Sequence, residues 1–456
     1  MRNLRRYVWK LAQGVVTGTL VLVCSAPALA GADTLALNAP DQPIFGAPAK
    51  TAIACNWRVA NGTPDATTKP GALRWGYLDL AAGYWQVILS PSFAAGTRFR
   101  FEGQFPAARN FSYQLYNGGS EELAALPDYQ VVPDSGSQSP FNGVNTLDTA
   151  IHPGGHYTAY LVYSAKPAHP AANTIYLDPK QVTAGNQVVL VYRVYNAFSG
   201  ITVAQHGAMP LPAVYEETAQ GDVPLASIDT TLICNLGIGA RDTERRSFSA
   251  ASDIYNGLPQ RPGAIPAKPV PAAPVFLLRD SASDILVNSD NRYIYAQLSQ
   301  TLGDLILVRL RAPTYATGPG AGSDPQVRHW SFCENAMLSA ETYSCIEDQD
   351  AVLDSGHFFN VVISVASKRP PSANAQHGFN WIAYGTTDVG FPIFRHMLPS
   401  PHFKQSAFNV PSGAAPQSTM GDYFPVATYC SSAVFAAHTQ AGETPARVFA
   451  DCQAGQ

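Results

Sequence analysis

The spacing of apolar residues along this chain is that of short β-strands. In residues 98–105, Phe99, Phe101 and Phe105 alternate with charged and polar side chains, which is the two-residue period of a strand with one buried face. Similar segments, bounded by Gly, Pro, Asn or Ser, lie at 84–89, 111–116, 128–132, 156–163, 174–177 and 188–195. No window keeps a helical period for more than about three turns. The sequence therefore predicts an all-β protein.

The second half of the chain repeats landmarks of the first. The pairs are Tyr84 and Tyr293, Arg109 and Arg328, His156 and His357, and Arg193 and Arg395. Their offsets, between 201 and 219 positions, stay constant within strands and change in loops, as expected for a duplicated domain. Each half holds roughly eight strand candidates, a number typical of double-sheet sandwiches. We therefore predict two tandem jelly-roll-like β-sandwich domains from an internal duplication, stapled by disulfides.

These patterns divide the chain into six expected parts. They are a signal peptide (1–30), a lead-in segment rich in Ala, Pro, Gly and Thr (31–72), a first β-sandwich (73–204), a connector (205–275), a second β-sandwich (276–405) and a C-terminal extension (406–456). The connector ends in a proline-dense tract, which favours an extended, semi-rigid spacer.

The first thirty residues have the three parts of a secretory signal peptide. Basic residues at positions 2, 5, 6 and 10 precede a short apolar run and an A-x-A site that ends at Ala30. The run is too short to span a membrane comfortably, and no later stretch is long and apolar enough to do so. We expect an exported protein, periplasmic or extracellular, without a membrane span.

Six cysteines follow the signal peptide, an even number that is typical of disulfide-bonded exported proteins. Proximity along the chain favours the pairs Cys333–Cys345 and Cys430–Cys452. Cys55 and Cys234 then remain to tie the two ends of the first half. No C-x-x-C pair occurs, so a zinc or thioredoxin-like motif has little support.

Charge argues against two classes of partner. Without the signal peptide the chain has 25 basic and 33 acidic residues, a net charge of −8. Nucleic acids and anionic membranes bind basic surfaces, so we expect neither as a partner. No Walker or dinucleotide glycine motif occurs, and we expect no cofactor. The sequence gives no indication of the oligomeric state.

Four arginines, Arg109, Arg193, Arg328 and Arg395, lie among apolar strand residues. A buried guanidinium needs carboxylate or carbonyl partners, because an unpaired buried charge is costly. One interpretation makes these arginines structural, paired with acids such as Asp128, Asp134, Glu334 or Asp348, and it is favoured because buried charges are usually paired. In the other, two or more share a cleft with Trp330 and bind a carboxylate or sulfate through the planar fork of the guanidinium group.

The histidines suggest weaker candidates for chemistry. His357, His329 and Glu334 are candidates for acid–base catalysis, because histidine titrates near neutral pH. His396 and His402 are weak metal candidates, since no H-E-x-x-H or tight H-x-H motif supports them, and hydrogen-bonded or surface histidines explain the pattern better. Residues 288–291 and 347–350 are rich in oxygen ligands, but neither matches an EF-hand loop and polar turns explain both equally well. No G-x-S-x-G elbow or S-x-x-K spacing marks a nucleophile.

Several short motifs resemble one group of proteins. They are Arg109-Asn-Phe-Ser-Tyr113, Asp128-Tyr-Gln-Val-Val-Pro-Asp134, Asp290-Asn-Arg-Tyr293, Arg328-His-Trp-Ser-Phe-Cys333 and Arg395-His-Met-Leu-Pro-Ser-Pro401. Over roughly residues 73–405 the chain resembles uncharacterised secreted bacterial proteins that are similar to a jelly-roll domain family of unknown function. The resemblance implies a fold and a bacterial origin, and it brings no catalytic residue with it.

Three function hypotheses follow. The first is a binding or structural module with an aromatic and Arg-lined cleft for a carbohydrate or a small acidic ligand, since exposed aromatic rings stack on sugars and catalytic signatures are absent. The second is a hydrolase or lyase acting on an extracellular polymer, in which an Arg/His/Tyr cluster neutralises a carboxylate and removes a proton. That hypothesis rests on fold-level analogy alone. The third is a scaffold without any ligand.

Overall fold

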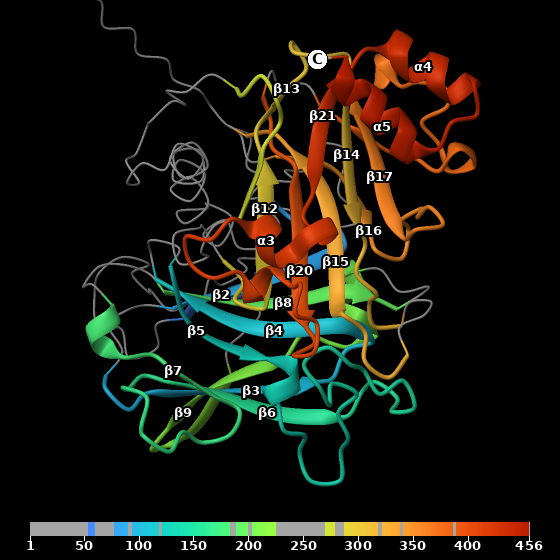
Figure 1. Ribbon diagram of the computed structural model, residues 1–456. Coiled ribbons are helices and arrows are strands. Elements are labelled where there is room, and N and C mark those ends of the chain that lie inside the picture. The colour runs from blue at the N-terminus through green and yellow to red at the C-terminus, as the bar shows by residue number, and fades with distance from the viewer. Residues whose placement is uncertain are drawn as a thin grey trace, which may run out of the picture. The chain divides into compact units, whose positions relative to one another are not determined.

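Strands are the main regular structure in both halves of the chain, as the alternation of apolar residues predicts (Figure 1). The computed structural model describes residues 53–59, 77–89, 94–117, 121–182, 188–198, 203–224, 270–278, 287–317, 322–337, 341–385 and 389–455, with the backbone alone for 53–59, 88, 203–205 and 224. Residues Pro43–Gln456 cluster as one unit, so contacts between the sheets described below lie within it. The expected signal peptide lies outside the described residues.

The first half forms a sandwich of two five-stranded sheets. One sheet has the order β1-β2-β8-β4-β5 and the other the order β10-β9-β3-β6-β7. The strands are β1 (Ile53–Val59), β2 (Ala82–Leu89), β3 (Arg98–Gln104), β4 (Ala108–Tyr116), β5 (Glu122–Pro127), β6 (His156–Val162), β7 (Thr174–Tyr176), β8 (Val188–Ala197), β9 (Ala213–Thr218) and β10 (Gly221–Pro224). Phe99 and Phe101 of β3 meet Phe111 and Tyr113 of β4 in an aromatic core, as the alternation in residues 98–105 predicts.

The second half forms another sandwich. Its larger sheet has the order β11-β12-β20-β15-β16, its smaller sheet the order β18-β17-β14-β21, and β13 pairs with β19. The strands are β11 (Phe276–Leu278), β12 (Asn291–Ala296), β13 (Leu298–Ser299), β14 (Leu305–Arg311), β15 (Val327–Asn335), β16 (Thr342–Glu347), β17 (Phe358–Ser364), β18 (Asn380–Ala383), β19 (Val389–Gly390), β20 (Ile393–Pro399) and β21 (Val426–Cys430). Trp330 and Phe332 of β15 lie in its core. The protein is thus mostly β, with sheets that form sandwiches of the jelly-roll type.

The two sandwiches have matching strand orders. The order β2-β8-β4-β5 in the first corresponds to β12-β20-β15-β16 in the second, and β9-β3-β6-β7 corresponds to β21-β14-β17-β18. Both contain one parallel contact at the corresponding place, β6 with β7 and β17 with β18. The registers agree as well, because Arg193 lies opposite Tyr84 and Ser112, and Arg395 lies opposite Tyr293 and Ser331.

Among the described residues the helices are short, and the α-helices lie near the C-terminus. They are the 3-10 helices η1 (Asp128–Gln130), η2 (Pro179–Gln181), η3 (Val203–Ala208), η5 (Ala366–Lys368), η6 (Ala375–His377), η7 (Ala407–Asn409) and η8 (Gly421–Tyr423), and the α-helices α3 (Pro416–Met420), α4 (Ser432–Gln440) and α5 (Pro445–Ala454). Ser431 and Thr444 cap α4 and α5 by accepting backbone N–H hydrogen bonds. The disulfide Cys430–Cys452 links β21 to α5, as predicted.

Several sequence-based assignments change. Residues 128–130 form a 3-10 turn rather than part of a strand, because the Val131 N–H bonds back to the Asp128 backbone oxygen, while the Asp128 carboxylate accepts the Phe111 N–H. Residues 213–224, expected in the connector, form β9 and β10, and β9 pairs with β3. β1 lies in the expected lead-in and β21 in the expected C-terminal extension. Both sheet systems therefore reach past the limits read from composition. The expected pair Cys55–Cys234 falls outside the residues whose side chains are described.

Candidate functional site

The candidate site lies on the faces of β4 and β15 that point away from the two aromatic cores. Alternation places Phe111 of β4 and Trp330 of β15 in the cores and turns Asn110, Ser112, His329 and Ser331 to the opposite faces. These polar side chains are all buried, because the sheet that contains β4 and the sheet that contains β15 cover each other there. Burial requires every polar group to find a partner within the protein.

Two reciprocal ion pairs join the sheets. Arg109 of β4 donates to both carboxylate oxygens of Asp348, at 2.6 and 2.7 Å, and to the Gln349 side chain at 2.7 Å. Arg328 of β15 donates to both oxygens of Asp128, at 3.2 and 3.0 Å. Each arginine therefore pairs with an acid of the other sandwich. The structural interpretation of these two arginines fits this geometry, with the partners exchanged between the halves.

Each of the two aspartates is also held by its own sandwich. Asp128 accepts the backbone N–H of Phe111 at 3.1 Å, and Asp348 accepts that of Trp330 at 3.1 Å. A carboxylate with backbone N–H donors and a guanidinium partner is well compensated for the loss of water. Each acid is thus held both by its own sandwich and by an arginine of the other.

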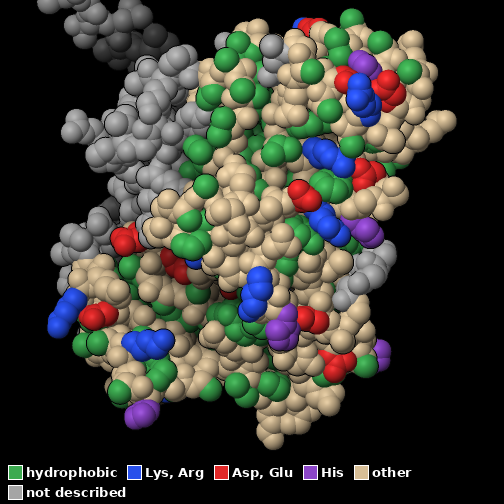
Figure 2. All heavy atoms as spheres, viewed as in Figure 1, with side chains coloured by type: hydrophobic (Ala, Val, Ile, Leu, Met, Phe, Trp, Pro, Cys, Tyr) green, Lys and Arg blue, Asp and Glu red, His purple; other side chains and the backbone are tan. Residues whose placement is uncertain are grey.

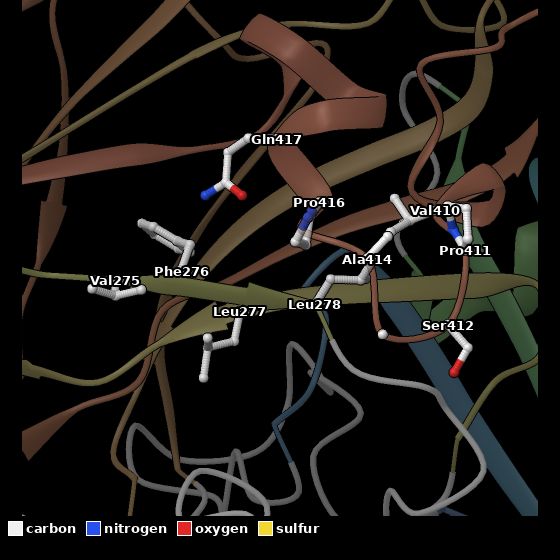
Figure 3. A pocket seen from close by; sticks show the side chains of 11 residues that line it. Val275, Phe276, Leu277, Leu278, Val410, Pro411, Ser412, Ala414, Pro416 and Gln417 are labelled. Atoms are coloured by element: carbon white, nitrogen blue, oxygen red, sulfur yellow. The ribbon is translucent and has the colours of Figure 1, made fainter.

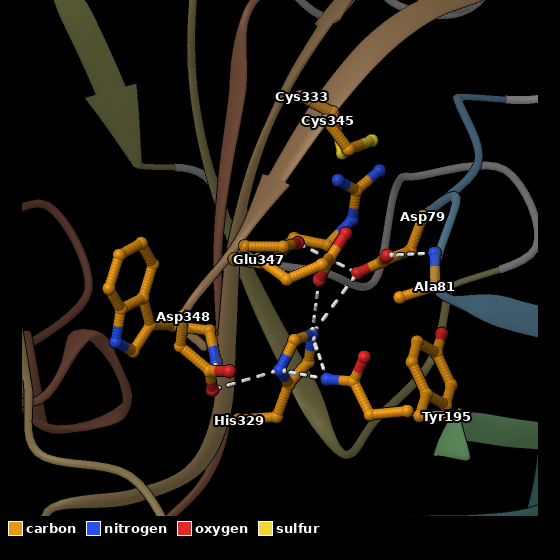
Figure 4. A network of polar contacts seen from close by, with 12 residues as sticks. Asp79, Ala81, Tyr195, His329, Cys333, Cys345, Glu347 and Asp348 are labelled. Atoms are coloured by element: carbon orange, nitrogen blue, oxygen red, sulfur yellow. Dashed lines mark hydrogen bonds and ion pairs between the residues drawn. A yellow bond between two sulfur atoms is a disulfide. The ribbon is translucent and has the colours of Figure 1, made fainter. Parts of the chain in front are cut away.

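His329 lies at the centre of a titratable cluster, shown in Figure 4. Its Nε2 lies 3.3 Å from Asp79 and 3.2 Å from Glu347, and its Nδ1 lies 3.1 Å from Asp348. The side-chain amide of Asn196 lies 2.7 Å from Nδ1. The imidazole is fully buried, so its surroundings decide its charge.

The surroundings separate the protonation states of the cluster. Burial alone would lower the pKa of His329, but Asp348, Asp79 and Glu347 raise that pKa well above its usual value. Burial would raise the pKa of Asp79, but His329 and Arg395 hold it below its usual range. Burial and the charge of Asp79 raise the pKa of Glu347 to about 8. At neutral pH the cluster therefore holds a protonated imidazole between ionised aspartates, with Glu347 neutral.

The corresponding positions in the other half carry no such cluster. Asn288 corresponds to Asp79, since each backbone N–H meets the hydroxyl of the tyrosine five positions later. Asn110 corresponds to His329, because the two occupy matching registers against β8 and β20. Amides thus replace the acid and the imidazole at these two positions.

The remaining two arginines line no open cleft among the described residues. Arg193 donates to Gln114 and lies over the rings of Tyr84 and Tyr116, with its carbon 5.8 and 5.4 Å from their centroids. Arg395 donates to the backbone oxygen of Tyr77. Both are buried, with 3% and 2% of their surface exposed.

Of the other predicted site residues, some are interior and some lie far from the cluster. Trp330 is a core residue that donates to the Pro313 oxygen, and Glu334 is buried in the second sandwich, where burial raises its pKa well above the usual value. Burial lowers the pKa of His396 to about 3. His402 is exposed and contacts Asp324.

His357 precedes β17, away from His329, and is exposed at the surface. Its backbone is left-handed, with φ of 62°. The structure thus brings Arg109, Arg328, Arg395 and His329 into one network and leaves Trp330, Glu334, His357, His396 and His402 outside it.

Sequence reasoning missed Asp79, Asn196 and the role of Glu347. Asp79 follows the undescribed residues 60–76 and belongs to no motif, so nothing in the sequence marks it. Glu347 was noticed only as part of an oxygen-rich stretch. Its position opposite Ser331 in the pairing of β15 with β16 is the signal that a register alignment would use.

A separate pocket lies between the edge strand β11 and the segment that leads into α3 (Figure 3). Its volume is about 380 Å³. Most of its lining is apolar, from Val275, Phe276, Leu277, Leu278, Val410, Pro411, Ala414 and Pro416, with Gly413 and the polar Ser412 and Gln417 beside them. No arginine or histidine is among the described residues that line it.

Surface charge is dispersed on the face shown in Figure 2, where acidic and basic side chains are interspersed. Among the described residues, no helix has the length and apolar character needed to cross a membrane.

Comparison with known proteins concerns the fold. No protein-family model matches the chain, and no curated protein sequence matches it. An uncharacterised protein from Burkholderia cenocepacia has 14% identity and a TM-score of 0.46, over 71% of this chain and 75% of its own. A protein from Vibrio parahaemolyticus has 10% identity and a TM-score of 0.33, over 77% of this chain and 89% of its own. The chain is therefore similar to uncharacterised bacterial proteins with a β fold, and the resemblance to a jelly-roll family of unknown function stays a prediction.

Proposed function

We propose that the protein is an exported binding or structural module built on a rigid pair of β-sandwiches, and not an enzyme. The observation that supports this proposal is that the candidate polar residues are buried and bind one another. Arg109, Arg328 and His329 are 0–3% exposed and satisfied by carboxylates. A catalytic group must come within hydrogen-bond reach of its substrate, and these groups contact one another instead.

The ligand side of this proposal belongs to the pocket beside β11. Its volume falls in the range of small-molecule sites, and its apolar lining with two polar side chains is typical of them. A small acid needs a cation, and no charged side chain is among the described residues that line the pocket. An apolar ligand such as an acyl chain suits these residues better.

Ligand binding is tested by filling the pocket. Ala414 lines it and Ala415, the next residue, is exposed and outside it. We expect a fluorescent fatty-acid probe to bind the wild-type protein saturably, to lose binding in Ala414→Arg and to keep it in Ala415→Arg. A wild-type protein that does not bind the probe, or equal binding by the two variants, contradicts the ligand assignment.

The enzymatic alternative is tested separately. A panel of polysaccharide, glycoside and ester substrates is incubated with the wild-type protein and with His357→Ala, which changes an exposed candidate residue. We expect no turnover by either protein. Turnover that disappears in His357→Ala would overturn the proposal of a purely binding or structural role.

A further inference from the structure

The disulfide Cys333–Cys345 lies against two buried carboxyl groups. It joins directly opposite residues of β15 and β16. One ligand atom each of Asp79, Cys333, Cys345 and Glu347 lies within 4.8 Å of all the others. Figure 4 shows the two sulfurs beside the Glu347 and Asp79 side chains.

Glu347 is the least satisfied member of this group. Its Oε2 lies 3.2 Å from Nε2 of His329, but neither carboxylate oxygen makes a well-formed hydrogen bond among the described residues, although the residue is only 6% exposed. Asp79, by contrast, accepts from the Ser331 hydroxyl at 2.7 Å and from the backbone N–H of Ala81. A buried carboxyl group that has one poorly aligned contact and is directed at a second carboxylate would gain from a cation bound between the two.

The corresponding place in the first sandwich has none of these groups. By register, Gln114 and Ala125 correspond to the two cysteines and Pro127 corresponds to Glu347, while Asn288 corresponds to Asp79. The same strand contacts therefore form without two sulfurs and two carboxylates. The fold therefore does not require these four potential ligands at this place.

Sulfur and carboxylate together make a ligand set for a thiophilic divalent cation. Zn²⁺ binds Cys sulfur at about 2.3 Å and carboxylate oxygen at about 2.0–2.2 Å, which puts the ligand atoms of a tetrahedral site roughly 3.4–3.8 Å apart. The cluster already lies within a slightly larger span. Disulfide sulfurs are poor ligands, because the thiolate is the form that binds metal.

We propose that Asp79, Cys333, Cys345 and Glu347 form a redox-gated site for Zn²⁺ or a similar thiophilic cation, closed by the disulfide and opened by a dithiol reductant. In the opening step the reductant's two sulfurs become its disulfide, and its two hydrogens end on the sulfurs of Cys333 and Cys345. In the binding step the cation displaces the thiol protons, and the proton of the Glu347 carboxyl group, to solvent. Cys345 is partly exposed, so a small reductant can reach it.

The test uses the purified full chain and Cd²⁺, whose bonds to thiolates give an ultraviolet charge-transfer absorption. The oxidised protein is compared with protein that was reduced with dithiothreitol and desalted without oxygen. We expect about one tightly bound Cd²⁺ after reduction and none before it. This comparison needs no variant, so it remains valid if a substitution fails to fold.

Variants then assign the ligands. Glu347→Gln and Asp79→Asn should each weaken Cd²⁺ binding by about tenfold or more, the scale of losing a group that tunes a metal site. Glu341→Gln is the matched control, because Glu341 is exposed just before β16. Cys333→Ser/Cys345→Ser should abolish the absorption, whereas Cys430→Ser/Cys452→Ser should keep it. Zn²⁺ should protect Cys333 and Cys345, but not Cys430 and Cys452, from alkylation, as mapped by mass spectrometry.

Three results would overturn the proposal. They are equal Cd²⁺ binding before and after reduction, full binding by Cys333→Ser/Cys345→Ser, and binding by Glu347→Gln and Asp79→Asn as tight as that of Glu341→Gln. The first two place the cation elsewhere, and the third leaves the thiols without the carboxylates.

Discussion

The two reciprocal ion pairs allow a sharp comparison, because removing the arginine leaves the two aspartates in different surroundings. In Arg109→Met, Asp348 keeps the protonated His329 at 3.1 Å and the Trp330 N–H. In Arg328→Met, Asp128 keeps only neutral donors, and its pKa is already raised by burial. We therefore expect Arg328→Met to be the more destabilising change.

The hydrogen bonds widen the difference. Arg328 also donates to the backbone oxygens of Val144, Gly143 and Arg109, and these acceptors lose their donor in the variant. Removing one partner of a buried pair costs ~3–5 kcal/mol. Arg109→Met should fall near ~3 kcal/mol, because a second cation remains, and Arg328→Met at ~5 kcal/mol or above, because stranded carbonyl groups add to the cost.

The measurement is equilibrium unfolding in urea, followed by tryptophan fluorescence and circular dichroism, with the second substitution as the control. Adding Asp128→Asn to Arg328→Met removes the stranded charge and should recover ~1–3 kcal/mol. Adding Asp348→Asn to Arg109→Met should recover little or lower the stability further, because Asp348 also balances His329. Losses of equal size for the two arginines, or no recovery with Asp128→Asn, would refute the reasoning.

Three further predictions concern single groups. Burial and nearby acids raise the pKa of Asp290 to about 7, so the folded protein holds a proton that the unfolded chain releases above about pH 4. The free energy of unfolding should therefore fall as the pH rises from about 4 to 7. Asp290→Asn should remove this slope and be more stable than the wild type by up to ~4 kcal/mol above pH 7, as measured by urea unfolding at several pH values. The Cys430–Cys452 bridge spans 22 positions, so Cys430→Ser/Cys452→Ser should lower the free energy of unfolding by ~3 kcal/mol, and a change under ~1 kcal/mol would contradict the loop-entropy account. A Cβ at Gly390 would lie 2.2 Å from a Glu334 oxygen and 2.8 Å from the Tyr384 ring, so Gly390→Ala should lower the stability by ~1–3 kcal/mol, as measured by thermal unfolding. Gly356→Ala is the control, because the nearest contacts of its Cβ would be at 3.3 Å and its loss of stability should be clearly smaller.

The local periodicity of apolar residues was enough to predict much of the fold. Phe99 and Phe101 are buried as their alternation predicts, and the pairs Cys333–Cys345 and Cys430–Cys452 form as their proximity predicts. These features depend on neighbours in sequence, which a single chain displays. The strand predicted at 128–132 is wrong, because residues 128–130 form a 3-10 turn in which the Val131 N–H bonds to the Asp128 backbone oxygen and the Asp128 side chain bonds to Phe111 of β4.

The candidate site was harder to predict from the sequence, because the residues that contact one another there are far apart along the chain. Arg109 and Asp348 are 239 positions apart, and Arg328 and Asp128 are 200 apart. The sequence correctly indicates that each arginine needs an acid, but it cannot say from which sandwich the acid comes. Asp79 lies 250 positions from His329 and carries no local signal at all.

The exchange of partners itself explains why the arginines and acids occur in matching positions. In a two-fold symmetric contact between identical subunits, a residue i that touches j implies that j touches i across the axis. Arg109 with Asp348 and Arg328 with Asp128 obey this rule once each half is treated as one copy, and the matching strand orders put all four residues in equivalent places. A pair formed within one sandwich would stabilise that sandwich alone. With exchanged pairs, the buried arginine and aspartate of each sandwich are neutralised only when the other sandwich is in place. The polar residues of the sheets that contain β4 and β15 therefore hold the two halves in one register.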